Sequence, residues 1–72
     1  MNYQYYIERR DGLKYCVQND HGYLENLVSE IGESLVNEFI VLGFIYTGYT
    51  LEKETWGINP LGKRYYEMVK PD

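Results

Sequence analysis

The sequence of 72 residues lacks the features that usually stabilise a small protein. Its single cysteine, Cys16, excludes an internal disulfide, and no clustered set of cysteine and histidine offers a metal site. Domains near this lower size limit commonly depend on disulfides, on a metal or on association with another chain. We therefore expect one domain over residues 1–72, without metal or cofactor, that associates with a partner.

Long apolar runs and targeting signals are also missing. No apolar stretch approaches the roughly 18 residues that a membrane span needs. The start, Met1 to Gln4, has no charged segment followed by an apolar one, so no signal peptide is expected. An unpaired cysteine is typical of a reducing compartment, which predicts a cytoplasmic location without membrane contact.

The residues of nucleophilic catalysis are few and scattered. Such catalysis needs a nucleophile beside a base that a third group orients. The only histidine, His21, lies in a polar stretch, and the two serines, Ser29 and Ser34, lie elsewhere in the sequence. Residues 43–50 have the glycine spacing of a phosphate-binding loop, but Tyr49 stands where its lysine must be. The sequence predicts no catalytic residue and no nucleotide site, and hence a binding protein and not an enzyme.

Tyrosine is abundant, with nine tyrosines against two phenylalanines and one tryptophan. Tyrosine offers a large contact area with little conformational entropy to lose, and it is enriched at binding surfaces. It also suits half-buried strand positions. A domain of this size cannot bury all nine, so Tyr6 and Tyr15, which lie near the basic pair Arg9 and Arg10, are candidates for partner binding.

Alternation of apolar and polar residues predicts two β-hairpins. Residues 3–9 and 13–18 alternate on either side of Asp11-Gly12, a dipeptide that suits a tight type I′ turn. Residues 44–51 and 55–58 alternate around a charged turn. Trp56 would be buried and would anchor this second hairpin to the rest of the domain.

Apolar residues recur at helical spacing between the two hairpins, from residue 23 to about residue 42. Asp20 precedes this stretch as part of a capping signal, and Gly43 suits its end. Gly32 lies in the middle, where a glycine costs about 1 kcal/mol relative to alanine and allows a kink. The pattern predicts one long central helix.

A last helix is predicted after Asn59-Pro60, because proline is favoured at the first helical position, and Pro71 would end it. The predicted order of elements is therefore ββαββα. The fold class is α+β, with two β-hairpins packed on one long central helix and a short C-terminal helix.

The second half of the chain resembles a winged-helix domain. In that family a helix ends in a turn of the Leu-Gly-Leu-Ile type, a two-stranded wing follows, and a Thr/Asn-Pro-x-Gly turn begins a closing helix. Residues 42–45 (Leu-Gly-Phe-Ile) and 59–62 (Asn-Pro-Leu-Gly) match the two turns. The family has two further helices where residues 3–18 predict a hairpin. The resemblance implies a degenerate winged helix as the alternative fold and a DNA-binding transcriptional regulator as the alternative function.

Charge is distributed unevenly along the chain. No lysine or arginine occurs between Lys14 and Lys53, while the predicted central helix is acidic. This helix either presents a solvated face or docks on a basic surface of a partner. The candidate partner-binding acids are Glu25, Glu30, Glu33 and Glu38. Because the net charge is −4, phosphate backbones would repel the protein, and we do not expect tight binding to duplex DNA.

The end of the central helix is apolar nearly all round. Val36, Ile40 and Val41 extend beyond the stripe that faces the core, and a helix of this kind is buried on more than one side. Identical patches that meet about a two-fold axis are the commonest way to bury it. We predict a homodimer, or an obligate complex with a partner, through these three residues, unless the second hairpin or the last helix covers this end.

These features predict a small acidic module that binds a protein partner. A small, tyrosine-rich domain without a catalytic set resembles, in style, the accessory and anti-defence proteins of bacteriophages and prophages. The resemblance implies an inhibitor or modulator of a host cytoplasmic protein.

Overall fold

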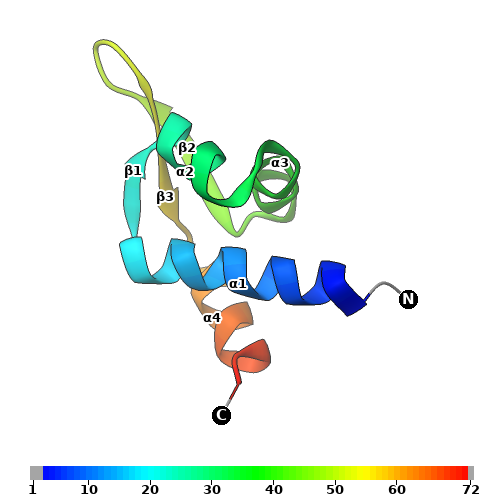
Figure 1. The fold of residues 1–72 in the computed structure, drawn as a ribbon. Coiled ribbons are helices and arrows are strands. Elements are labelled where there is room, and N and C mark those ends of the chain that lie inside the picture. The colour runs from blue at the N-terminus through cyan, green and yellow to red at the C-terminus, as the bar shows by residue number, and fades with distance from the viewer. Residues whose placement is uncertain (1–2, 72) are drawn as a thin grey trace.

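The computed structural model describes residues 3–71, which form four helices and a three-stranded antiparallel sheet (Figure 1). In chain order the elements are α1 (Tyr3–Asn19), β1 (His21–Tyr23), α2 (Leu24–Ile31), α3 (Glu33–Leu42), β2 (Ile45–Tyr49), β3 (Glu54–Ile58) and α4 (Pro60–Val69). The α+β class is confirmed. The predicted order ββαββα and the first hairpin are wrong.

Residues 3–18, predicted as a hairpin, lie in the single helix α1. Gly12 does not make a turn. It lies inside the helix, where an added Cβ atom would stand 3.2 Å from Cδ1 of Leu35. The glycine therefore lets α1 approach α2 and α3 closely. The alternation that predicted a strand was misleading because Tyr3 and Tyr5 are exposed, so the pattern did not reflect burial.

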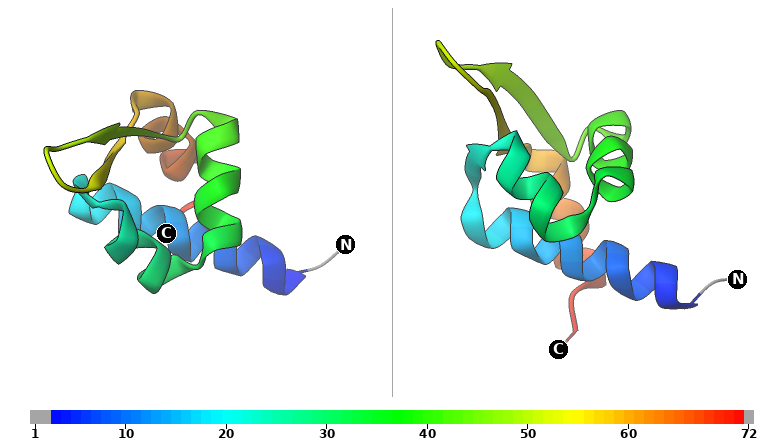
Figure 2. Two further views of the ribbon diagram at one scale, coloured as in Figure 1. Left: turned by 90° about the horizontal axis from the view of Figure 1, so that it is seen from above. Right: turned by 45° about the horizontal axis from the view of Figure 1, so that its top comes forward.

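The predicted central helix is two helices, α2 and α3, which run in different directions (Figure 2). They are separated at Gly32, whose φ of 92° and ψ of 149° are helix-breaking and accessible mainly to glycine. The Gly32 amide donates to the carbonyl of Val28, and its own carbonyl accepts from the amide of Val36. Gly32 thus ends α2 and begins α3, and the expected kink is a full break.

Strand β1 was not predicted. Asp20 adopts a φ of 72° directly after α1 and turns the chain into β1. The sheet order is β1-β3-β2, and Trp56 of β3 pairs with Gly22 on one side and with Thr47 on the other. Strands β2 and β3 form the predicted second hairpin, which projects beyond the helices (Figures 1 and 2).

One hydrophobic core connects helices and sheet. It consists of Leu13, Cys16, Leu27, Val36, Phe39, Phe44, Ile45, Trp56 and Ile58. Trp56 is 3% exposed, which confirms its predicted burial. The ring of Phe44 lies 5.9 Å from that of Phe39 and 4.8 Å from that of Tyr65, and so links α3 to α4.

Helix α4 begins at Pro60, as predicted, and is held against the turn that follows α3. The Asn59 amide donates to the Phe44 carbonyl at 2.9 Å, and the Asn59 side-chain amide donates to the Gly43 carbonyl at 3.0 Å. Gly62 lies so close that an added Cβ would stand 2.5 Å from the Phe44 carbonyl oxygen. The two turns at residues 42–45 and 59–62 are therefore in direct contact.

Candidate functional site

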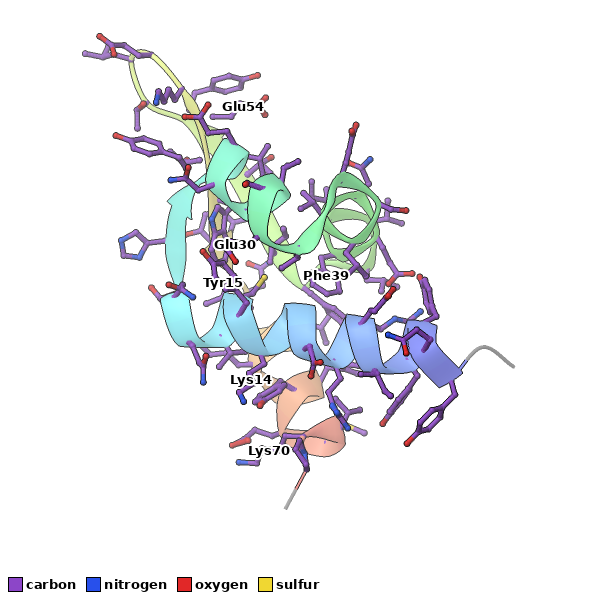
Figure 3. All side chains as sticks on the ribbon, viewed as in Figure 1. Lys14, Tyr15, Glu30, Phe39, Glu54 and Lys70 are labelled. Carbon is purple, nitrogen blue, oxygen red and sulfur yellow. The ribbon has the colours of Figure 1, made fainter. Side chains whose placement is uncertain are left out.

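A groove lies between α1 and the corner at which α2 meets α3. It is lined by Tyr5, Glu8, Asp11, Gly12, Tyr15, Glu30, Ile31, Ser34 and Leu35. Positions 5, 8, 12 and 15 of α1 are spaced by three or four residues, which places them on one side of a helix. The labelled side chains of Tyr15 and Glu30 lie in the space between α1 and α2 (Figure 3). The groove thus follows one side of α1 for about three turns.

The groove has an apolar base and an acidic rim. Gly12 is buried and Ile31 and Leu35 are half-buried, whereas Glu8, Asp11 and Glu30 are exposed. None of the lining residues is basic. Three carboxylates around an uncharged base favour a positively charged ligand.

These carboxylates have weak partners within the protein. Glu8 accepts from the Gln4 side-chain amide at 3.5 Å, and the exposed Asp11 lies 3.7 Å from the half-buried guanidinium of its neighbour Arg10. Glu30 makes no ion pair with any residue in the range 3–71. The negative charge of the rim is therefore largely uncompensated.

Of the predicted partner-binding residues, the structure brings two into the groove, Glu30 and Tyr15. Glu33 is exposed and directly precedes the lining residue Ser34. Tyr6 stacks on Tyr3 at 6.5 Å. It lies nine residues from Tyr15, a rotation of about 180° around a helix, so Tyr6 and Tyr15 point to opposite sides of α1.

Glu38 is engaged inside the protein and is not available in the way that was predicted. It accepts from Nε and Nη2 of Arg9 at 2.9 and 3.2 Å and also from the hydroxyl of Tyr5. The Arg9 guanidinium lies 5.1 Å from the centre of the Tyr5 ring. Hydrogen bonding to Tyr5 and to Glu38 raises the pKa of Arg9. We call these three residues the Arg9 clasp, which joins the N-terminal half of α1 to α3.

Glu25 is engaged as well. Its carboxylate accepts from Nζ of Lys53 at 2.7 Å, which connects α2 to the β2–β3 loop. This hydrogen bond raises the pKa of Lys53, and the ammonium also lies 5.0 Å from the centre of the Tyr23 ring. Glu25 and Glu38 therefore serve contacts within the fold, and of the four predicted acids only Glu30 and Glu33 stay without an ion pair among residues 3–71.

A second candidate surface lies at the end of α3. Val41 is 85% exposed, and Ile40 and Leu42 are 37% and 42% exposed. Leu61, 48% exposed, adjoins them, because its Cδ2 atom lies 3.6 Å from the position of a Cβ on Gly43. We call these four residues the apolar end of α3.

The structure corrects one residue of the predicted dimer interface. Val36 is 2% exposed and belongs to the core, because it lies on the same side of α3 as Phe39. It cannot contribute surface to an interface. Ile40 and Val41 remain exposed, and neither the β2–β3 hairpin nor α4 covers Val41.

Cys16 and His21, the side chains most often used as nucleophile or base, lie in different surroundings. Burial raises the pKa of the Cys16 thiol to about 12, so it stays protonated at neutral pH and is a poor nucleophile. His21 lies at the start of β1, where its Nδ1 atom is 3.0 Å from the carboxylate of Asp20. That contact lowers the pKa of Asp20. Among residues 3–71, no group of three or more histidine, cysteine, aspartate or glutamate side chains is placed to hold a metal ion.

Of the nine lining residues, seven were not predicted from the sequence, and four of these, Tyr5, Glu8, Asp11 and Gly12, were assigned to a hairpin, where alternate residues would face opposite sides. The spacing of Tyr5, Glu8, Gly12 and Tyr15 was the available signal, because a helix would place all four on one side. The α1 part of the rim was therefore missed, whereas Glu30 of the rim and Ile40 and Val41 of the apolar end of α3 were singled out from the sequence.

Comparisons with protein-family models, with curated proteins and with solved structures found no match to this chain. Within residues 3–71, none of the helices combines the length and the apolar character that crossing a membrane requires.

Proposed function

We propose that this chain is a protein-binding module on a winged-helix arrangement. The order of its elements supports this arrangement: α1 and α2 precede α3, the β2–β3 hairpin follows as a wing, and α4 closes the chain. The two turns that carry the resemblance, residues 42–45 and 59–62, are in direct contact through Asn59.

The chemistry of α3 is the observation that carries a protein-binding function. This helix occupies the place of the DNA-reading helix of a winged-helix domain. Such a helix is expected to bring positive and polar groups to the phosphates and bases. Here α3 has Glu33, Glu38 and an exposed Val41, and residues 15–52 contain no lysine or arginine. Clustered exposed apolar side chains on a small domain are typical of a protein contact.

A second copy of the chain is the proposed occupant of the apolar end of α3. A stable homodimer buries about 800 Å² on each partner, and four side chains do not provide this area alone. The interface therefore extends to neighbouring surface. The side of α4 that carries the exposed Leu61 adjoins the apolar end of α3 and would supply this surface. A role as modulator of a larger cytoplasmic protein, as in bacteriophage accessory proteins, fits a module with two distinct contact surfaces.

The alternative function, a DNA-binding regulator, is favoured by the arrangement of elements and by one further observation. Five of the seven basic residues lie in α1 or α4, and Lys14 is on the side of α1 that faces α4 (Figure 3). Nucleic acid would then contact α1 and α4, and α3 would point elsewhere.

A titration of labelled random duplex DNA, followed by fluorescence anisotropy at about 150 mM salt, separates the two functions. Protein binding as the main function predicts no saturable binding below about 1 μM, because the net charge is −4 and α3 is acidic. Sub-micromolar binding that is lost in the variant Lys14→Glu, and kept in Glu33→Gln, would establish the DNA-binding alternative instead.

A further inference from the structure

The groove between α1 and the α2–α3 corner differs in chemistry from the apolar end of α3 and calls for a different ligand. We propose that the groove receives a positively charged, extended segment of a partner protein, one rich in arginine or lysine. This inference rests on the proposed protein-binding function and specifies the partner's chemistry at one site.

Charge complementarity is the first reason. Carboxylates rise from both walls of the groove, Glu8 and Asp11 from α1 and Glu30 from the end of α2. A guanidinium or ammonium between the walls would meet acceptors from two sides, and such charge-assisted hydrogen bonds are about twice as strong as neutral ones. The carboxylate of Glu30 has no ion pair within residues 3–71 that a ligand would have to displace.

The uncharged part of the groove suits the rest of a basic side chain. Lysine and arginine bury their methylene stems along apolar surface while the charged head stays near water, and Ile31 and Leu35 offer such a surface. The ring of Tyr15 lines the same groove and can carry a cation on its face. The protein itself already shows this contact at the other end of the α1 wall, where the Arg9 guanidinium lies 5.1 Å from the centre of the Tyr5 ring.

The length of the groove indicates a segment and not a single ion. Its α1 wall extends from Tyr5 to Tyr15, ten residues that rise about 15 Å along a helix. An extended chain covers this distance with about four or five residues. A metal ion is not the ligand expected, because within residues 3–71 the carboxylates do not converge on a common point.

The test uses the full chain and two fluorescein-labelled peptides with glycine and serine flanks, one containing four consecutive arginines and one containing four consecutive glutamates. Anisotropy at about 50 mM and 150 mM salt measures binding. The groove variant is Glu8→Gln with Glu30→Gln, and the matched control is Glu52→Gln with Glu54→Gln. Both change two exposed carboxylates, and the control pair lies on the β2–β3 hairpin outside the groove. Far-UV circular dichroism verifies that both variants are folded.

We expect saturable binding of the arginine peptide only, a loss of at least about tenfold in affinity in the groove variant, and less than about twofold in the control. Backbone amide shifts in NMR spectra should change at Gly12, Ile31 and Ser34 when the peptide is added. Equal losses in both variants would show general attraction to an acidic protein, and no saturable binding would show that the groove is not a site for cations. Either result overturns the inference.

Two further outcomes would show that the peptide binds elsewhere or that a second copy of the chain occupies the groove. Shifts confined to Ile40 and Val41 would place the peptide at the apolar end of α3, which overturns the groove and leaves protein binding intact. A homodimer that dissociates in the groove variant, without peptide binding, would give the groove to a second copy and also overturn the inference. A failure of the proposed protein-binding function would be detected separately, as sub-micromolar binding in the titration with duplex DNA.

Discussion

The two sides of helix α1 differ sharply in what they present to a partner. On the side that packs against α2 and α3, the helix carries Glu8 and Asp11 beside a groove. On the side that packs against α4, the helix carries Lys14, whereas Tyr15 and Glu30 lie across the helix (Figure 3). A single helix therefore carries carboxylates beside a concave region on one side and a lysine on the other.

This separation shows that the net charge of −4 says little about any one surface. The acidic side offers carboxylates around a groove, so a basic partner has a shaped place to bind. On the other side, Lys14 and, in α4, Arg64 make no ion pair among residues 3–71, whereas Lys63 and Lys70 pair with Asp20 and Glu67. Mutations on either side, or in the core that both share, test whether the two regions are independent.

The largest effect is expected from removing the core that supports both sides. Trp56 is 3% exposed, and its indole Nε1 lies 3.4 Å from the position of a Cβ on Gly22 of β1. Trp56→Ala should cost about 3–5 kcal/mol, which lowers the melting temperature of a domain this small by more than about 10 °C. Thermal unfolding followed by circular dichroism measures this. A near-normal melting curve would mean that the ring is not part of the core.

The next largest effect compares how closely α4 and α1 pack against their neighbours at Gly62 and Gly12. An alanine at Gly62 would place Cβ 2.5 Å from a backbone oxygen, whereas an alanine at Gly12 would meet only the end of the Leu35 side chain at 3.2 Å. Gly62→Ala should destabilise by about 1–3 kcal/mol. Gly12→Ala should stay within about 1 kcal/mol, because the gain in helix propensity offsets the crowding. Urea unfolding of both variants measures the two losses of stability. Equal losses would contradict the close packing of α4 at Gly62.

A pH-dependent effect is expected from Cys16 on the inner side of α1. Burial raises the pKa of this thiol from 9.0 to about 12. A raised pKa means that the folded state keeps its proton longer, so the stability from this group is complete below pH 9 and is lost as the pH rises towards 12. Between pH 9 and pH 10 the loss is about 1 kcal/mol. Urea unfolding at both pH values should show this loss in the wild type and not in Cys16→Ala, which lacks only the thiol. Parallel losses would contradict the buried thiol.

The smallest effect is expected from the Arg9 clasp. Glu38→Gln removes the charge of a partly exposed pair with Arg9, which should cost about 0.5–1 kcal/mol after allowance for solvent screening. Glu52→Gln is the matched control, because Glu52 is exposed, lies outside the helices and has no ion pair among residues 3–71. Urea unfolding should separate the two variants, and a control that loses as much as Glu38→Gln would show that the clasp is not stabilising.

The parts of the fold that the sequence predicted are those with local signals. Asn59-Pro60 begins α4 at the expected residue, Gly43 ends α3 with a left-handed φ of 80°, and strands β2 and β3 pair as a hairpin. Each depends on the backbone preference of a residue at the position in question.

The parts that were not predictable depend on tertiary contact. Gly12 is favoured inside α1 because another helix lies close to it, and no local rule reports such an approach. Gly32 breaks a continuous apolar stripe, and whether a glycine kinks a helix or ends it is decided by the packing of both halves. Among the candidate residues, Glu25 and Glu38 were plausible surface acids, but cations distant in sequence, Lys53 and Arg9, neutralise them.

Sedimentation of the purified chain tests most directly the central claim that the apolar end of α3 is a protein contact. We predict a homodimer at tens of micromolar that becomes monomeric in Val41→Glu. The helical circular dichroism should be unchanged in that variant, because Val41 is 85% exposed and its side chain does not support the core. Ser29→Glu, which adds a charge on the exposed surface of α2, outside both the groove and the apolar end of α3, should leave the dimer intact. A wild-type chain that is monomeric throughout this range, or a Val41→Glu variant that stays dimeric, would contradict the claim.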